Sequence, residues 1–191
     1  MRRAALWCAI LGGAVFATPA PAEVQARAKV EQYDIRGATA AQLRAEMNAR
    51  GPTGPGGQRF DGYTRWYVSW SYTFRSGRGP CAIDRVTTEV KVTTTLPRWA
   101  DEARADNALR DQWRRYLAAL TRHEDGHAQN GLGAARDIDA AIARLPAESS
   151  CDTLGARANA TGQALLRQYN QRDLDYDRET GHGRGQGASF P

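Results

Sequence analysis

The sequence lacks two features that would place it among membrane-spanning or nucleic-acid-binding proteins. Apart from one apolar run near the start, no stretch approaches the roughly 20 apolar residues that cross a bilayer. The arginines are scattered, and basic residues are not interleaved with aromatic ones. We therefore expect no nucleic-acid partner and no membrane span once the N-terminal segment is removed.

That N-terminal segment has the pattern of an export signal. Arg2 and Arg3 precede an apolar run over residues 4–17, and Ala20-Pro21-Ala22 suits cleavage before Glu23. We expect residues 1–22 to be a signal peptide and residues 23–191 to form one domain, periplasmic or secreted. The formal net charge of +5 then falls to +3, because residues 1–22 contain no acidic residue.

Cysteine is also scarce, with three residues in the whole chain. Cys8 lies in the apolar run and leaves with the signal, so only Cys81 and Cys151 remain. An isolated pair in an oxidising compartment is more often a disulfide than a metal or redox site. We therefore predict a Cys81–Cys151 disulfide.

Alternating hydrophobicity predicts a hairpin in the first half of the chain. A short strand is expected around Tyr33, followed by a helix from Thr39 that ends at Gly51-Pro52. The segment WYVSWSYTF alternates large apolar and small polar residues, as does the run from Val86 to Leu96. The two runs predict a long antiparallel β-hairpin. Its Trp66 and Trp70 face is expected to be buried, the alternative being a sugar-stacking platform.

Helical spacing dominates the second half. Apolar residues recur every three or four positions from Trp113 to Leu145, either as one very long helix or as two with a break near residues 131–133. A further helix is predicted from about Asp152 to Tyr169. The polar, glycine-rich tail beyond it is expected to be a loop on composition alone. These patterns predict an α+β fold, with a small sheet packed on helices.

The predicted long helix carries the most specific motif of the sequence, His123-Glu124-Asp125-Gly126-His127. Residues four apart on a helix lie one turn apart on one face, so both imidazoles can reach one metal ion. Glu124 shares the apolar stripe, where an unpartnered carboxylate is costly to bury. The alternative is a solvated histidine pair, but the H-E-x-x-H spacing favours zinc and a hydrolytic glutamate.

Small residues surround this motif. Ala119, Gly126, Ala128 and Gly131 are expected to leave room for a metal, a water and an approaching peptide.

The chain resembles the bacterial family catalogued as domain of unknown function 922, whose members are described as predicted secreted zinc-dependent proteases. The similarity rests on the export signal, YDIRGATAAQL, WYVSWSYTF, the His123–His127 motif and YDRETGHGRGQG. It implies a zincin-like peptidase in which Glu124 is the general base for a zinc-activated water. No histidine follows His127 at the spacing of an extended metzincin motif, so the third ligand must lie elsewhere.

His182 is predicted as that third zinc ligand, because it is the only other histidine and glycines flank it. Asp177, Asp175 and Glu179 are the alternatives, and Asp177 could instead orient a ligand histidine. Tyr176 or Arg184 in the tail is expected to donate a hydrogen bond to the tetrahedral oxygen of the reaction. The expected substrate is a peptide or protein.

Three other functions remain open on the sequence. The same zinc chemistry suits an amidase acting on cell-wall peptide. A non-catalytic periplasmic binding protein could use zinc to hold its tail onto the helix. A carbohydrate-binding module would require Trp66 and Trp70 to be exposed.

Overall fold

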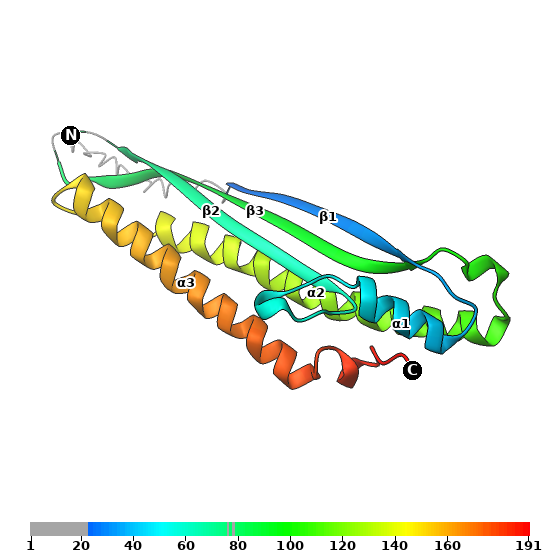
Figure 1. The fold of residues 1–191 in the computed structure, drawn as a ribbon. Helices are drawn as coiled ribbons and strands as arrows, with labels where there is room; N and C mark the ends of the chain where they lie inside the picture. Colours follow the sequence, from blue (N-terminus) through cyan, green and yellow to red (C-terminus); the bar gives the residue numbers. More distant parts are fainter. Residues whose placement is uncertain (1–22, 76, 78) are drawn as a thin grey trace, which may run out of the picture.

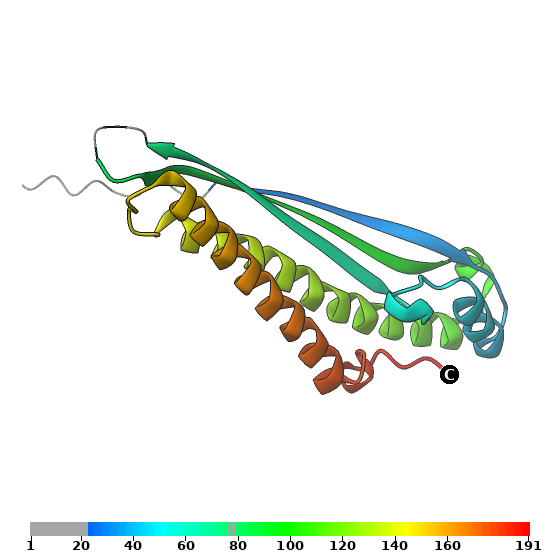
Figure 2. The same ribbon diagram turned by 60° about the vertical axis from the view of Figure 1, so that its left-hand side comes forward.

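The structure is a computed structural model that describes residues 23–75, 77 and 79–191. The predicted signal peptide, with Cys8, lies outside the described residues. A three-stranded sheet lies over two long helices that run side by side (Figures 1 and 2), which confirms the α+β fold class. The elements are β1 (Glu23–Ile35), α1 (Ala40–Arg50), β2 (Tyr63–Arg75), β3 (Ala82–Trp99), α2 (Asn107–Ala143) and α3 (Cys151–Thr180), with short 3-10 turns at Pro55–Gly57, Glu102–Arg104 and Arg184–Gln186.

The strand order in the sheet is β1-β3-β2. The predicted hairpin is confirmed: β2 pairs antiparallel with β3, and Trp66 lies opposite Val92. The strand predicted around Tyr33 is much longer than expected, because β1 runs for 13 residues parallel to β3. The alternation of apolar residues in β1 is weak, because Ala26 and Ala28, two of the alternating residues, have a low preference for strands.

The aromatic face of β2 packs toward the helices. Trp66 and Trp70 are half-buried, and their indole N–H groups donate to Asp173 and Asn159 of α3 at 2.6 and 3.2 Å. The core interpretation of this face is thereby favoured over a sugar-stacking platform, which required exposed rings.

The long helical pattern forms one continuous helix. α2 has 37 residues, and its N-cap Asp106 accepts a hydrogen bond from the Leu109 N–H. A rise of 1.5 Å per residue makes it about 56 Å long, enough to follow the whole sheet. Gly131 does not break it: a Cβ there would lie 2.6 Å from Cγ of Trp66, so this glycine lets the sheet approach the helix closely.

The last helix is longer than the sequence predicted. α3 continues past Tyr169 to Thr180 and stops at Gly181, whose φ of 59° is left-handed. The prediction of a loop was therefore wrong for residues 174–180. These residues are polar because the C-terminal end of α3 buries only a narrow face, and polar composition alone suggested a loop. Beyond the helix, Ala188 and Phe190 return to the core, where Phe190 packs against Trp113 and Tyr116.

The predicted disulfide is confirmed. Cys81 and Cys151 are bonded, joining the start of β3 to the first residue of α3 across 70 residues of sequence. Backbone hydrogen bonds between Cys81 and Glu148 lie beside it. Among the described residues, no helix is long and apolar enough to cross a membrane.

We expect the Cys81→Ala/Cys151→Ala double variant to lose about 4 kcal/mol of unfolding free energy, because a loop of this length is no longer closed in the unfolded chain. Urea unfolding of the oxidised protein and the variant gives the difference. The reduced wild-type protein is the control and should match the variant. Equal stability of all three would contradict the prediction.

Candidate metal centre

Helix α2 carries three buried polar side chains close together. His123, Glu124 and His127 are 3, 3 and 8 % exposed, although all three side chains are polar or ionisable. The helical spacing of His123 and His127 places their rings 4.9 Å apart in an edge-on arrangement. Buried polar groups need partners, and these are supplied by other elements.

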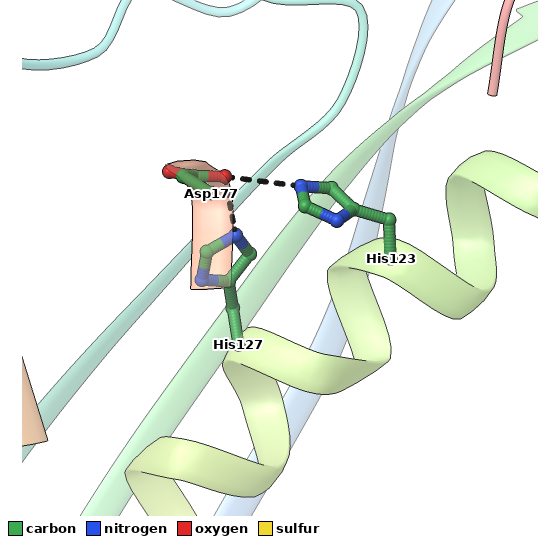
Figure 3. A group of neighbouring side chains, drawn as sticks. All are labelled: His123, His127 and Asp177. Carbon is green, nitrogen blue, oxygen red and sulfur yellow. Dashed lines mark hydrogen bonds and ion pairs between the residues drawn. The ribbon is translucent and has the colours of Figure 1, made fainter. Parts of the chain in front are cut away.

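Asp177 of α3 lies between the two histidines. Since α2 and α3 pack antiparallel, α3 runs back along α2, and its C-terminal part, which includes Asp177, lies beside the histidine pair. Its Oδ1 lies 3.2 Å from Nε2 of His123 and 3.2 Å from Nε2 of His127 (Figure 3). One ligand atom from each of the three residues lies within 4.8 Å of the others.

This group of atoms suits a metal ion. Two imidazole nitrogens and one carboxylate oxygen are ligands that a catalytic zinc ion accepts. Ligand atoms that are 2.0–2.1 Å from a tetrahedral zinc ion are about 3.3 Å from one another, close to the two 3.2 Å distances around Asp177. The residues present therefore fit a divalent cation.

The far nitrogen of His123 is held by the C-terminal tail. Its Nδ1 lies 3.1 Å from Oε1 of Gln186, while Nε2 of Gln186 donates to the Tyr176 hydroxyl at 3.0 Å. With the amide oriented in this way, Oε1 accepts the Nδ1–H of His123. Nε2 of His123, which faces Asp177, is then the ring nitrogen placed to bind a metal.

The far nitrogen of His127 is held by a second carboxylate. Nδ1 of His127 lies 3.2 Å from Oδ1 of Asp173. Asn130 donates to the same oxygen, and Trp66 donates to Oδ2, both at 2.6 Å. Asp173 is thus fixed by α2 and β2 and orients His127, the carboxylate–histidine arrangement common around zinc sites.

Glu124 lies beside this group and against the start of β2. A Cβ at Gly62 would be only 2.9 Å from Oε1 of Glu124, so a side chain there would displace the carboxylate. Burial raises the pKa of Glu124 above its ordinary value, an effect that hydrogen bonding to Thr64 and the charges of the two histidines partly offset. A carboxyl group whose pKa is raised in this way holds a proton more readily than an exposed glutamate, which suits it to proton transfer.

Contacts within the group shift the pKa values of His127 and Asp177. Burial alone would lower the pKa of His127, but Asp173 and Asp177 outweigh it and raise this pKa to about 10. Burial alone would raise the pKa of Asp177, but hydrogen bonds from His123 and His127 hold it well below its usual range. A cation binding here must therefore displace a proton from His127, so metal affinity should rise with pH.

The other residues predicted as third ligand, His182, Asp175 and Glu179, are not part of the group formed by His123, His127 and Asp177. Nδ1 of His182 is 3.3 Å from Oδ1 of Asp177, but His182 is half exposed and does not belong to the described group of mutually close ligand atoms. It is the only described non-glycine residue with a positive φ, 54°. Asp175 accepts from Gln171 and Arg178 instead, and Glu179 is exposed.

Tyr176 packs behind the motif. Its ring stacks on His123 with centroids 5.0 Å apart, and a Cβ at Gly126 would lie 2.4 Å from the Tyr176 hydroxyl oxygen. Gly126 and Gly131 therefore make room for the rings of Tyr176 and Trp66. The expectation that these two glycines make room for metal and peptide was wrong, because sequence spacing does not show which neighbour fills the space.

A pocket of about 590 Å³ opens onto the site. One wall is the connector between α1 and β2, held by Asp61: its carboxylate accepts two hydrogen bonds from Arg44, at 2.7 and 2.8 Å, and one from Tyr116, at 2.6 Å. The pocket lining includes Glu124, both motif histidines, Asp177, His182 and Arg184, as well as Phe60, Tyr63, Leu120 and Phe190.

Sequence reasoning missed Asp173 and Gln186, the two residues that orient the histidines. For Asp173 a signal existed, since it lies four residues before Asp177 and so on the same face of α3. For Gln186, in a glycine-rich tail, no local pattern indicated the contact.

The model of a family described as a bacterial protein of unknown function (DUF922) matches residues 30–183, which include the histidine motif and Asp177. No curated protein and no solved structure matches the chain.

We expect Gly126→Ala to destabilise the fold by about 1–3 kcal/mol, because the new methyl group overlaps the Tyr176 ring. In a Tyr176→Ala background the same change should be neutral or stabilising. Gly155→Ala is the matched control within α3, since its Cβ meets only ordinary contacts at 3.4–3.5 Å. Urea unfolding measures all four variants, and an equal cost of Gly126→Ala in both backgrounds would exclude the overlap as its cause.

Proposed function

We propose that this chain, which belongs to the bacterial DUF922 family, is an exported zinc-dependent peptidase. The observation that carries the proposal is the group formed by His123, His127 and Asp177 at a pocket that Glu124 also lines. The H-E-x-x-H spacing pairs two ligands with a neighbouring glutamate, the arrangement used by hydrolytic zinc sites.

The proposed ligands are His123, His127 and Asp177, one of the carboxylate alternatives to His182. Their mutual distances support this set, as does the way Gln186 and Asp173 hold the far nitrogens of the two histidines. Zinc bound there supplies a Lewis acid that lowers the pKa of water and polarises the scissile carbonyl.

The chain itself supplies the proton transfer. Glu124 is the proposed general base: its carboxylate accepts a proton from the attacking water and returns it to the leaving amine. Gly62 leaves space for this carboxylate at the pocket wall, and the Thr64 hydroxyl donates to the backbone carbonyl of Glu124 at 3.2 Å. For the donor to the tetrahedral oxygen we favour Arg184 over Tyr176, because Arg184 lines the pocket whereas the Tyr176 hydroxyl is engaged by Gln186.

The Cys81–Cys151 disulfide supports the proposed location. Disulfides persist in oxidising compartments, which agrees with a periplasmic or secreted protein.

A cell-wall peptide amidase is the nearest alternative, since the bond cleaved is again an amide. Release of peptide from peptidoglycan, measured beside cleavage of casein, separates the two. A non-catalytic zinc-binding protein would have a closed site with four protein ligands. The pocket that opens onto the group favours the catalytic proposal.

We expect Glu124→Gln to abolish peptide hydrolysis while zinc content stays near that of the wild type. The amide keeps the size of the side chain but cannot accept a proton from water. Zinc is measured by metal analysis and turnover against a peptide library, with a chelator-treated wild-type sample as control. A variant that retains wild-type turnover would rule out Glu124 as the base.

We expect Asp177→Ala to lower zinc affinity far more than His182→Ala, in a competitive chelator titration. Asp173→Ala should cost about 10–100-fold, since it removes the partner of His127. Asp175→Ala is the matched control, because its carboxylate contacts only Gln171 and Arg178. Loss of zinc in His182→Ala with full retention in Asp177→Ala would instead assign the third ligand to His182.

A further inference from the structure

Strand β1 is an open edge of the sheet. It lies outside β3 in the order β1-β3-β2 and pairs with β3 over its whole length. Among the described residues no strand pairs with its other edge, so a row of backbone N–H and C=O groups is open to a further strand.

The helix-facing side of β1 is also uncovered. Parallel pairing places Ala26, Ala28 and Val30 opposite Val90, Val92 and Thr94, which are buried beneath the sheet. The three β1 residues therefore face the helix layer, yet all three are exposed, and Val30 is 64 % exposed. The helices lie beneath β2 and β3 and leave β1 projecting beyond them (Figure 2).

We propose that β1 pairs antiparallel with β1 of a second copy of this chain, about a two-fold axis at Val30. The axis runs perpendicular to the sheet, so both helix layers lie on the same side of a continuous six-stranded sheet. Pairing satisfies the open backbone groups of both edges and brings the two exposed Val30 side chains together.

The charges of β1 select this register. With the axis at Val30, Lys29 lies opposite Glu31 of the partner subunit, twice by symmetry, and no like charges are opposed. An axis at Lys29 or Glu31 sets that residue against its own copy, and an axis at Ala28 sets Arg27 against Lys29 of the partner subunit. Opposite charges stabilise cross-strand pairs and like charges destabilise them.

Lysine on an edge strand ordinarily discourages pairing. Here Lys29 and Glu31 already form an ion pair within one strand. In the proposed dimer, Lys29 pairs with Glu31 of the partner subunit instead of with Glu31 of its own strand. The charges therefore discourage other registers without preventing this one.

Charge-reversal variants of the full-length chain test the proposal, with the dimer dissociation constant measured by sedimentation equilibrium. In Lys29→Glu, the new carboxylate faces Glu31 of the partner subunit at both symmetric positions, which should raise the dissociation constant by at least about tenfold. Lys29→Glu/Glu31→Lys should restore dimerisation. Lys91→Glu, on the central strand β3, is the matched control and should dimerise like the wild type. A wild-type protein that stays monomeric would overturn the proposal, as would a double variant no tighter than Lys29→Glu.

Single cysteines test the register, in a Cys8→Ser background. Val30→Cys should form a disulfide-linked dimer on mild oxidation, because the two residues meet at the axis. Ala26→Cys should not, since its copy lies eight residues, about 27 Å, along the paired strands. Equal cross-linking of both variants, or of Ala26→Cys alone, would show that this register is wrong.

Discussion

The close antiparallel packing of α2 against α3 is the constraint on which the site depends. Two glycines of α2 allow this close packing. Gly126 leaves space for the Tyr176 ring, and a Cβ added at Gly133 would lie 3.0 Å from the Tyr169 ring. With the helices this close, the C-terminal part of α3 lies against the middle of α2. Asp173 and Asp177 therefore reach the histidines of α2 from the facing helix.

The sheet and the tail complete what the helix pair begins. Trp66 of β2 donates to Asp173, and Gly62 leaves space for the Glu124 carboxylate. On the other side, Phe190 anchors the tail among core aromatic rings so that Gln186 meets His123. Each buried polar group of the site is thus held by a different element, which preorganises the ligand atoms at a low entropic cost of binding.

The electrostatics of the site follow from burial and from the histidines and carboxylates that contact one another there. Glu124 is kept from ionising easily by burial, whereas Asp177 is held ionised by the two imidazoles. The pKa values of Glu124 and Asp177, two carboxyl groups in one pocket, are consequently shifted in opposite directions. One suits proton transfer and the other suits holding a cation, and this separation of roles is typical of acid–base sites.

The sequence by itself determined the hairpin, the helical periodicity of α2 and the residues His123, Glu124 and His127, because local periodicity and i, i+4 spacing are properties of a single element. That α2 is one unbroken helix was decided by the structure. The sequence also indicated the disulfide, since only two cysteines follow the predicted signal. Only the tertiary structure decided that β1 extends to 13 residues, that α3 reaches Thr180, and that Asp177, Asp173 and Gln186 surround the histidines. Those features depend on contacts between residues 43 or more positions apart in the chain, which local sequence patterns do not show.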